Sequence, residues 1–165
     1  MKKALITTLV ILGTVGLIFL LALSSEKGAE KKIISYETMS SREVALTCTT
    51  DMATEFHIHP AVRIFIDGKE FPLPANIGIT DTCMHSIHTH SDMPVVHVEA
   101  PVAKDFTLGD FFAVWEKPFD KDHILDQVAD STHTVRVLVN GTSVDTYENT
   151  ILHDKDMIVI SYEKK

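Results

Sequence analysis

The sequence has little of what marks several large protein classes. Glycine and proline number 7 and 6 among 165 residues, and no low-complexity tract interrupts the chain. Disordered, collagen-like and coiled-coil proteins are therefore poor interpretations. Basic residues are also scarce, because 15 Lys and Arg face 23 Asp and Glu, which gives a formal net charge of -8. So acidic a surface repels phosphate backbones, and nucleic acid is excluded as a main partner.

Long hydrophobic runs are absent except at the N-terminus. Residues 4–23 are uncharged and rich in Leu, Ile and Val, and Lys2 and Lys3 precede them. A helix of that length spans roughly 30 Å, the thickness of the hydrocarbon core of a bilayer. The alternative is a cleaved signal peptide, but its apolar region is usually shorter and ends in small residues. No cysteine follows the run closely, which excludes a lipoprotein anchor.

We therefore expect three regions along the chain. Residues 1–25 form a transmembrane anchor that contacts the membrane through residues 4–23, or a signal peptide. Residues 26–43 are charged and polar and form a tether, and residues 44–165 form a histidine-rich β domain. The domain lies outside the cytoplasm, on a single-pass membrane protein or, if the N-terminus is cleaved, on a secreted one. With 45% apolar residues, the chain suffices for one domain.

Turn chemistry predicts a mostly β fold. Residues 62–66 alternate β-branched and aromatic side chains before Asp67-Gly68, and residues 135–139 precede Asn140-Gly141. Asp-Gly and Asn-Gly are strong signals for a two-residue hairpin turn. The shared string V-R-x-x-[IV]-[DN]-G fits either an internal duplication or convergence on the same turn. A further strand is expected over residues 157–162.

Helix signals are few. Thr107 and Asp110 have the spacing of a capping box at the start of an apolar segment, which Pro118 ends. A second short helix is expected over residues 122–129. The fold class is therefore mostly β (α+β), a small single domain of β-hairpins with one or two short helices, behind an N-terminal transmembrane helix.

Histidine is the over-represented residue. The chain has nine histidines, and six of them lie between His57 and His97. In extended chain, residues i and i+2 point to the same face, so the strings H-I-H and H-T-H each present two imidazoles together. Val96-His97-Val98-Glu99 likewise places an imidazole and a carboxylate on one face. One such pair is often an ordinary exposed feature, but two pairs brought together by a hairpin predict a metal site.

The expected metal ligands follow from these pairs. They are His57, His59, His88 and His90, with His97 as a substitute or a ligand of a second site. Glu99 is expected to accept a hydrogen bond from one ring, and His85, two residues from Cys83, could join a mixed site. His123, His133 and His153 are isolated in the sequence, and we interpret them as surface residues.

Four nitrogen donors suit copper(II) or zinc(II), with copper slightly favoured. The two cysteines, Cys48 and Cys83, leave two roles open. A disulfide would tie the two histidine-bearing segments together, whereas Cys83 as a thiolate with two histidines would make a blue-copper-like centre. The cupredoxin pattern of Cys followed closely by His and Met near the C-terminus is absent, which favours the disulfide.

The ordered motifs resemble those of a set of exported or membrane-anchored microbial proteins. That set carries H-I-H, L-H-T-H-D, I-H-x-E and F-T-L-G-x-F-F-x-x-W, followed by an N-G hairpin. The matching strings are His57–His59, Ile87–Ser91, Val96–Glu99 and Phe106–Trp115. The resemblance covers roughly residues 48–162 and implies a shared domain, but no activity is assigned to that set. The chain departs from the pattern at residues 91–94, where the set has Asp followed shortly by Gly.

Three functions fit the sequence. The first is a membrane-anchored metal-binding protein that handles copper or zinc and stores it or delivers it to a membrane metalloenzyme. The second is a metalloenzyme with three histidine ligands, an open coordination position and Glu99 as general base. The third is a β interaction domain whose histidines bind no metal.

Overall fold

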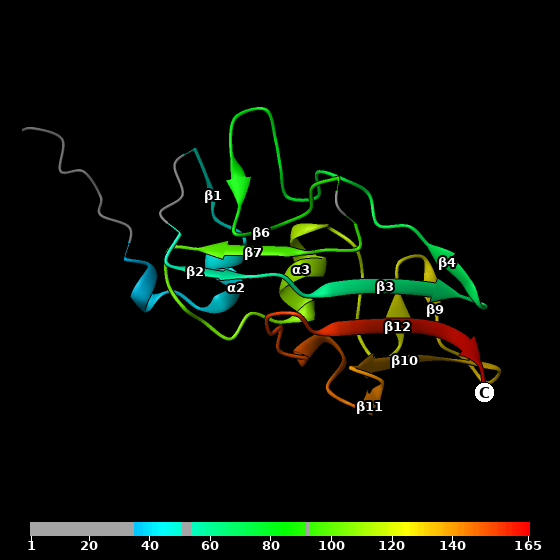
Figure 1. The fold of residues 1–165 in the computed structure, drawn as a ribbon. Helices are drawn as coiled ribbons and strands as arrows, with labels where there is room; N and C mark the ends of the chain where they lie inside the picture. Colours follow the sequence, from blue (N-terminus) through cyan, green and yellow to red (C-terminus); the bar gives the residue numbers. More distant parts are fainter. Residues whose placement is uncertain (1–34, 51–53, 92) are drawn as a thin grey trace, which may run out of the picture. The chain divides into compact units, whose positions relative to one another are not determined.

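A computed structural model describes residues 35–50, 54–91 and 93–165 of the chain (Figure 1). The expected anchor, and residues 26–34 of the expected tether, lie outside the described residues. Within the described ranges, no helix is both long and apolar enough to cross a membrane. One compact unit covers residues 35–165, so the described part of the expected tether belongs to the same unit as the β domain. It is mostly β with two short helices, as the sequence predicted.

The larger sheet has five strands. Their order is β11-β10-β12-β3-β4, with β12 parallel to β3 and every other neighbouring pair antiparallel. The strands are β3 (Ala61–Ile66), β4 (Lys69–Phe71), β10 (His133–Val139), β11 (Thr142–Val144) and β12 (Met157–Lys164). Alternation along β3 and β12 buries Val62, Ile64, Ile158 and Ile160 completely or nearly so. This sheet supplies a large part of the core.

Both predicted hairpins are confirmed, and they form the two edges of this sheet. The turn Asp67-Gly68 joins β3 to β4 with φ angles of 49° and 80°, and Asn140-Gly141 joins β10 to β11 with 52° and 81°. Positive φ at both central positions is what a type I′ turn requires, and Asp-Gly and Asn-Gly adopt it at low cost.

The smaller sheet has three antiparallel strands in the order β2-β7-β6. They are β2 (Phe56–Ile58), β6 (Ile87–His88) and β7 (His97–Ala100). One face carries Ile58, Ile87, Val98 and Ala100, each at most 8% exposed. This face belongs to the core, and helix α3 (Leu108–Val114) packs next to β6. The other face therefore remains for polar side chains.

Helix α3 begins as predicted. Thr107 Oγ1 accepts a hydrogen bond from the backbone N–H of Asp110, and the Asp110 carboxylate accepts one from the backbone N–H of Thr107. This reciprocal pair satisfies two of the N–H groups that every helix start leaves open. Phe111 and Phe112 point into the core with at most 1% exposure.

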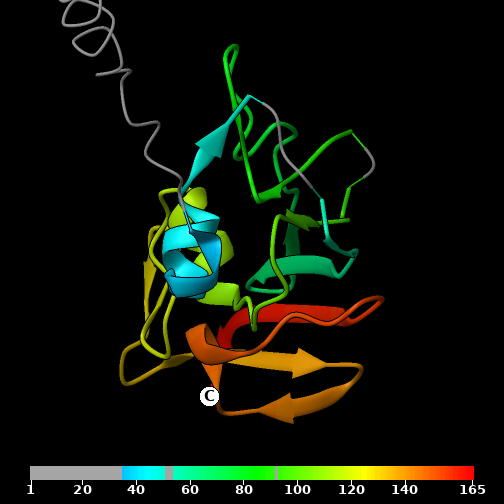
Figure 2. The same ribbon diagram turned by 90° about the vertical axis from the view of Figure 1, so that its left-hand side faces the viewer.

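The second helix lies where the sequence predicted tether. Helix α2 (Ser41–Ala45) follows a short 3-10 turn, η1 (Tyr36–Thr38), and has its own capping box between Ser40 and Glu43. Val44 and Ala45 are fully buried. Arg42 Nε donates to Asp110 Oδ1 at 2.6 Å, which ties α2 to α3, and the two helices lie side by side in both ribbon views (Figures 1 and 2).

The helix expected over residues 122–129 is wrong. The segment is a hairpin of β8 (His123–Ile124) and β9 (Gln127–Val128). Asp120 Oδ1 accepts the backbone N–H groups of residues 122 and 123 at 2.7 and 2.8 Å, and Leu125 takes a positive φ of 54°. An aspartate that bonds the backbone ahead of it favours a turn over a continuing helix.

The preferred role of the cysteines is confirmed. Cys48 and Cys83 form a disulfide with a Cα–Cα distance of 5.4 Å. It lies beside a short antiparallel pair, β1 (Cys48–Thr49) with β5 (Met84–His85). A thiolate ligand at Cys83, and hence a blue-copper-like centre, is excluded in this oxidised form.

Candidate metal centre

The face of the three-stranded sheet opposite its core side collects imidazoles because of its register. His57 of β2 is paired with Glu99 of β7, and His88 of β6 is paired with His97 of β7. His97 and Glu99 are two residues apart, so both point away from the core side that Val98 occupies. The two-residue alternation of side chains along β7, together with its pairing to β2 and β6, therefore places these four side chains on one face.

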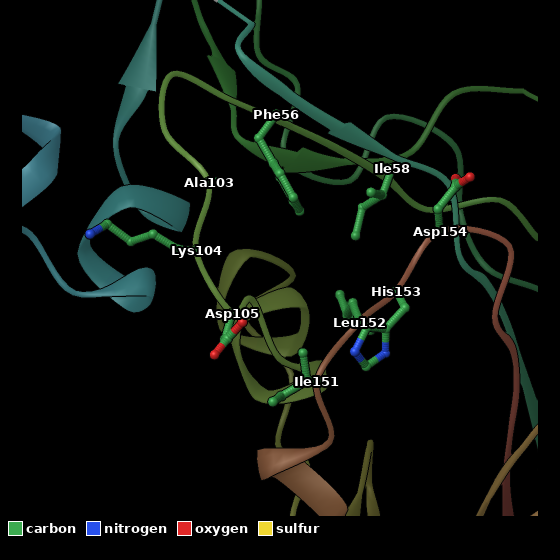
Figure 3. Close-up of a pocket in the computed structure, with 9 residues that line it drawn as sticks. All are labelled: Phe56, Ile58, Ala103, Lys104, Asp105, Ile151, Leu152, His153 and Asp154. Atoms are coloured by element: carbon green, nitrogen blue, oxygen red, sulfur yellow. The ribbon is translucent and has the colours of Figure 1, made fainter.

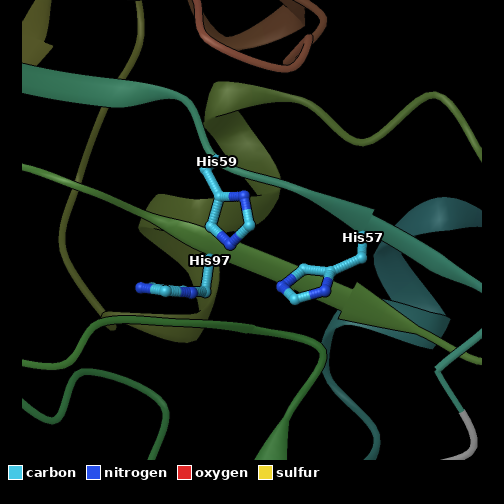
Figure 4. A group of neighbouring side chains, drawn as sticks. All are labelled: His57, His59 and His97. Carbon is cyan, nitrogen blue, oxygen red and sulfur yellow. The ribbon is translucent and has the colours of Figure 1, made fainter.

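His57, His59 and His97 form one group of rings. The ring centroids of His57 and His59 are 4.4 Å apart, and those of His59 and His97 are 4.9 Å apart. One ligand nitrogen from each of the three lies within 4.8 Å of the other two. Figure 4 shows the three rings as neighbours, with His59 next to both His57 and His97, while the centroids of His57 and His97 are 6.5 Å apart. Such spacing is close enough for one ion to bind all three after small ring rotations.

His88, His90 and His97 form a second group. Ring centroids are 4.8 Å apart for His88 and His90, and 4.8 Å apart for His90 and His97. The rings of His88 and His97 are nearly parallel, with centroids 5.5 Å apart. Their ligand nitrogens also lie within 4.8 Å of one another. His97 therefore belongs to both groups.

The structure gathers the predicted histidines but groups them differently from the expected set of four. Each H-x-H pair forms a triad with His97 instead of joining the other pair directly. His97, expected as a substitute ligand, is the shared member of the two triads. These triads can hold a metal ion through three imidazole nitrogens each, a donor set that zinc and copper sites use.

His88 has the properties of a ligand prepared for a cation. Its Nδ1 lies 3.0 Å from the backbone carbonyl of His85, to which only a protonated nitrogen can donate. In the neutral ring this leaves a lone pair on Nε2, which is buried and has no hydrogen-bond partner within the described structure. Burial lowers the pKa of His88, partly offset by the His85 carbonyl, so the ring stays neutral as a ligand must.

Glu99 lies among the rings, as the expected acceptor would. Its Oε1 is 3.2 Å from His57 Nε2 and 3.9 Å from both His88 Nε2 and His97 Nδ1. A single carboxylate oxygen thus meets a ring from each triad. Its negative charge favours a cation at this face and orients the nearest ring.

His85 contributes through its backbone and not through its ring. Its Nδ1 lies 3.2 Å from the carbonyl of Ala45, and no triad includes it. Because residue 85 pairs with Cys48 beside the disulfide, the carbonyl that holds His88 is itself held in place. The mixed site with Cys83 is not formed, since the cysteine sulfur is bonded to Cys48.

Asp154 is a residue of the site that sequence reasoning missed. Its Oδ1 accepts the backbone N–H of His59 at 3.0 Å and lies 3.8 Å from His59 Nδ1. The first of these contacts holds the pKa of Asp154 below its ordinary value, so the carboxylate is ionised beside the ring. Because the partners are 95 positions apart in the sequence, no local signal could have shown the contact.

A cavity of about 310 Å³ opens on the other side of β2 (Figure 3). Phe56 and Ile58, whose side chains point away from the His57 face, form its apolar wall together with Leu152. Asp154 lines this cavity and also bonds His59. The cavity is therefore separate from the histidine cluster but shares one supporting residue with it.

The three isolated histidines lie outside the triads, each beside an aspartate. His123 pairs with Asp120 at 2.9 Å, and His153 pairs with Asp156 at 3.2 Å. His133 lies 3.4 Å from Asp67 and stacks on Tyr162 with ring centroids 4.9 Å apart. These local partners account for the three rings without a metal.

Compared with known protein families, curated proteins and solved structures, the chain gives no significant match. The resemblance to exported or membrane-anchored microbial proteins therefore stays a prediction. The case for a function depends on the geometry of the histidine cluster.

Proposed function

We propose that this protein binds copper or zinc outside the cytoplasm, anchored to the membrane by residues 4–23, and stores or delivers the ion to a membrane metalloenzyme. The observation that carries the proposal is the cluster of five imidazoles in two triads on one sheet face. The lone pair of buried His88 Nε2, which lacks a hydrogen bond in the described structure, supports a cation as its partner.

The donor set favours borderline metals. Three imidazole nitrogens beside one carboxylate suit copper(II) and zinc(II), whereas calcium and magnesium prefer oxygen ligands throughout. The disulfide between Cys48 and Cys83 supports an oxidising compartment. Outside the cytoplasm, a sheet face that presents imidazoles can acquire copper without competition from cytosolic thiols.

A metalloenzyme is the second candidate, and one observation favours it. Each triad provides three nitrogens, which leaves a fourth position open to water or substrate, and Glu99 lies close enough to move a proton. Water exchange at bound copper(II), measured by EPR in isotopically labelled water, separates the two candidates. Exchangeable water favours the enzyme, and a position filled by protein nitrogen favours storage and delivery.

The decisive test is binding to the full chain. Wild-type protein is titrated with copper(II) and, separately, zinc(II) against a competing chelator. We expect His97→Ala to weaken binding by more than about 100-fold, since loss of mere supporting residues already costs about 10–100-fold. His123→Ala, the same change at a histidine outside the cluster, should leave the affinity unchanged. Equal affinities of the two variants would refute the proposed site.

A further inference from the structure

We propose that the two triads are alternative positions for a single ion, and that the ion passes between them while His97 stays bound. The inference rests on the metal-binding function proposed above. We call His57, His59 and His97 the entry position, and His88, His90 and His97 the inner position. The observation that carries it is the membership of His97 in both triads.

The burial of one ligand, His88, gives the transfer a direction. The side chains of His57 and His59 are 45% and 42% exposed, so a hydrated ion reaches these nitrogens without any change in the fold. The inner position combines the exposed His90 with His88, whose side chain is fully buried and whose Nε2 has no hydrogen bond among the described residues. An ion that moves inward gains His88 Nε2 as a ligand. Binding there removes the free-energy cost of a buried nitrogen that has no hydrogen bond.

Ring geometry keeps the ion coordinated during the move. His97 meets His59 edge-on at 4.9 Å on the entry side and meets His90 edge-on at 4.8 Å on the inner side. His59 and His57 can therefore leave the ion as His90 and His88 arrive. The ion exchanges one imidazole for another without returning to water, and no proton or electron is transferred.

Charge argues for one ion rather than two. Glu99 Oε1 meets His57 of the entry position and His88 of the inner position, whereas Asp154 contacts His59 alone among the five rings. Two divalent ions that share His97 would repel each other strongly at this separation, with one carboxylate between them. The same carboxylate can instead remain beside one ion in either position.

The test mixes the full chain rapidly with one equivalent of copper(II) and follows absorption and freeze-quenched EPR spectra. For wild type we expect one bound equivalent and two phases, in which an early nitrogen-ligated spectrum converts to a final one. His57→Ala should lose the fast phase yet reach the same final spectrum. His90→Ala should keep the fast phase, lose the slow one, and release copper to a chelator sooner.

Control variants distinguish a failure of the proposed transfer from a failure of the proposed metal binding. His123→Ala should keep both phases, and His59→Ala should repeat the behaviour of His57→Ala, because only the ring of His59 and not its backbone N–H is changed. Two copper ions per chain with a coupled EPR spectrum, or unchanged phases in His57→Ala, would overturn the transfer while metal binding stands. Wild type that binds neither copper(II) nor zinc(II) would overturn the proposed function itself.

Discussion

The two sheets differ in whether their outward-facing polar side chains find partners within the protein. In the five-stranded sheet, Arg63 donates two hydrogen bonds to Glu70 at 2.7 and 2.8 Å, and Arg136 lies 2.9 Å from Glu163. Each charge has its counter-charge on the neighbouring strand. This face is satisfied by the protein alone.

The three-stranded sheet leaves its face incomplete. Five imidazoles gather on this face, three of them within 3.9 Å of the carboxylate of Glu99, and buried His88 Nε2 has no hydrogen bond among the described residues. A stable fold gains nothing from such an arrangement, since an unsatisfied buried nitrogen costs free energy. The contrast supports the proposal that the outward face of the three-stranded sheet binds a ligand, whereas the outward face of the five-stranded sheet needs none.

Removing the disulfide should give the largest change in stability. It should also affect the three-stranded sheet more than the five-stranded sheet. Replacing both Cys48 and Cys83 by serine removes a link across 35 residues. In the chain-entropy model this lowers the free energy of unfolding by about 3–4 kcal/mol. Denaturant titration measures the loss. Hydrogen exchange should become faster mainly around residues 83–88, since the link braces the carbonyl that holds His88.

Reduced wild-type protein is the control for this double substitution, and it should match the variant in both measurements. Equal acceleration of exchange in β10 and β12 would contradict the comparison, because it would mean that the disulfide supports both sheets alike.

Local chemistry made much of the fold predictable. Asp67-Gly68 and Asn140-Gly141 specify their turns within four residues, and the Thr107 capping box specifies the start of α3. The box at Ser40 and Glu43 carried the same signal for α2, but the charged composition of residues 26–43 led to its assignment as tether. At Asp120 the side chain competes for backbone N–H groups, which an apolar pattern does not reveal.

The sequence was enough to predict which histidines belong to the candidate site, but not how they are grouped in space. Alternation along extended chain shows that His57 and His59, or His97 and Glu99, share a face. Which strands pair, and in what register, depends on contacts across some 40 residues in the chain. The central place of His97 follows only from the pairing of β7 with a strand on each side, His97 opposite His88 of β6 and Glu99 opposite His57 of β2.

A matched pair of core substitutions sharpens the comparison further. Ile87 of β6 and Ile160 of β12 are both fully buried, and Ile87 directly precedes His88. Ile87→Val and Ile160→Val should each lower the free energy of unfolding by about 0.5–1.5 kcal/mol, through the loss of one buried methylene. Only Ile87→Val should also weaken copper(II) binding, since it loosens the strand that positions His88.

Denaturant titration and chelator competition on the same preparations measure the two effects. Each variant serves as the other's control, because the chemistry and the burial are the same. If both substitutions weaken copper(II) binding equally, then the metal centre depends on the whole fold and not on the three-stranded sheet.

The smallest expected effect tests whether the five-stranded sheet is satisfied by its own charges. The hydrogen bonds from Arg63 hold the pKa of Glu70 below its ordinary value. The ionised carboxylate therefore stabilises the fold above the unfolded pKa of about 4.3, and this contribution is lost as pH falls through the lower folded pKa. Glu70→Gln should lower Tm slightly at pH 7, with the difference from wild type fading below pH 4. When Arg63→Gln is already present, Glu70→Gln should change Tm no further, and copper(II) affinity should stay constant throughout. A change in that affinity would show that the two faces are coupled, and the division of roles between the sheets would fail.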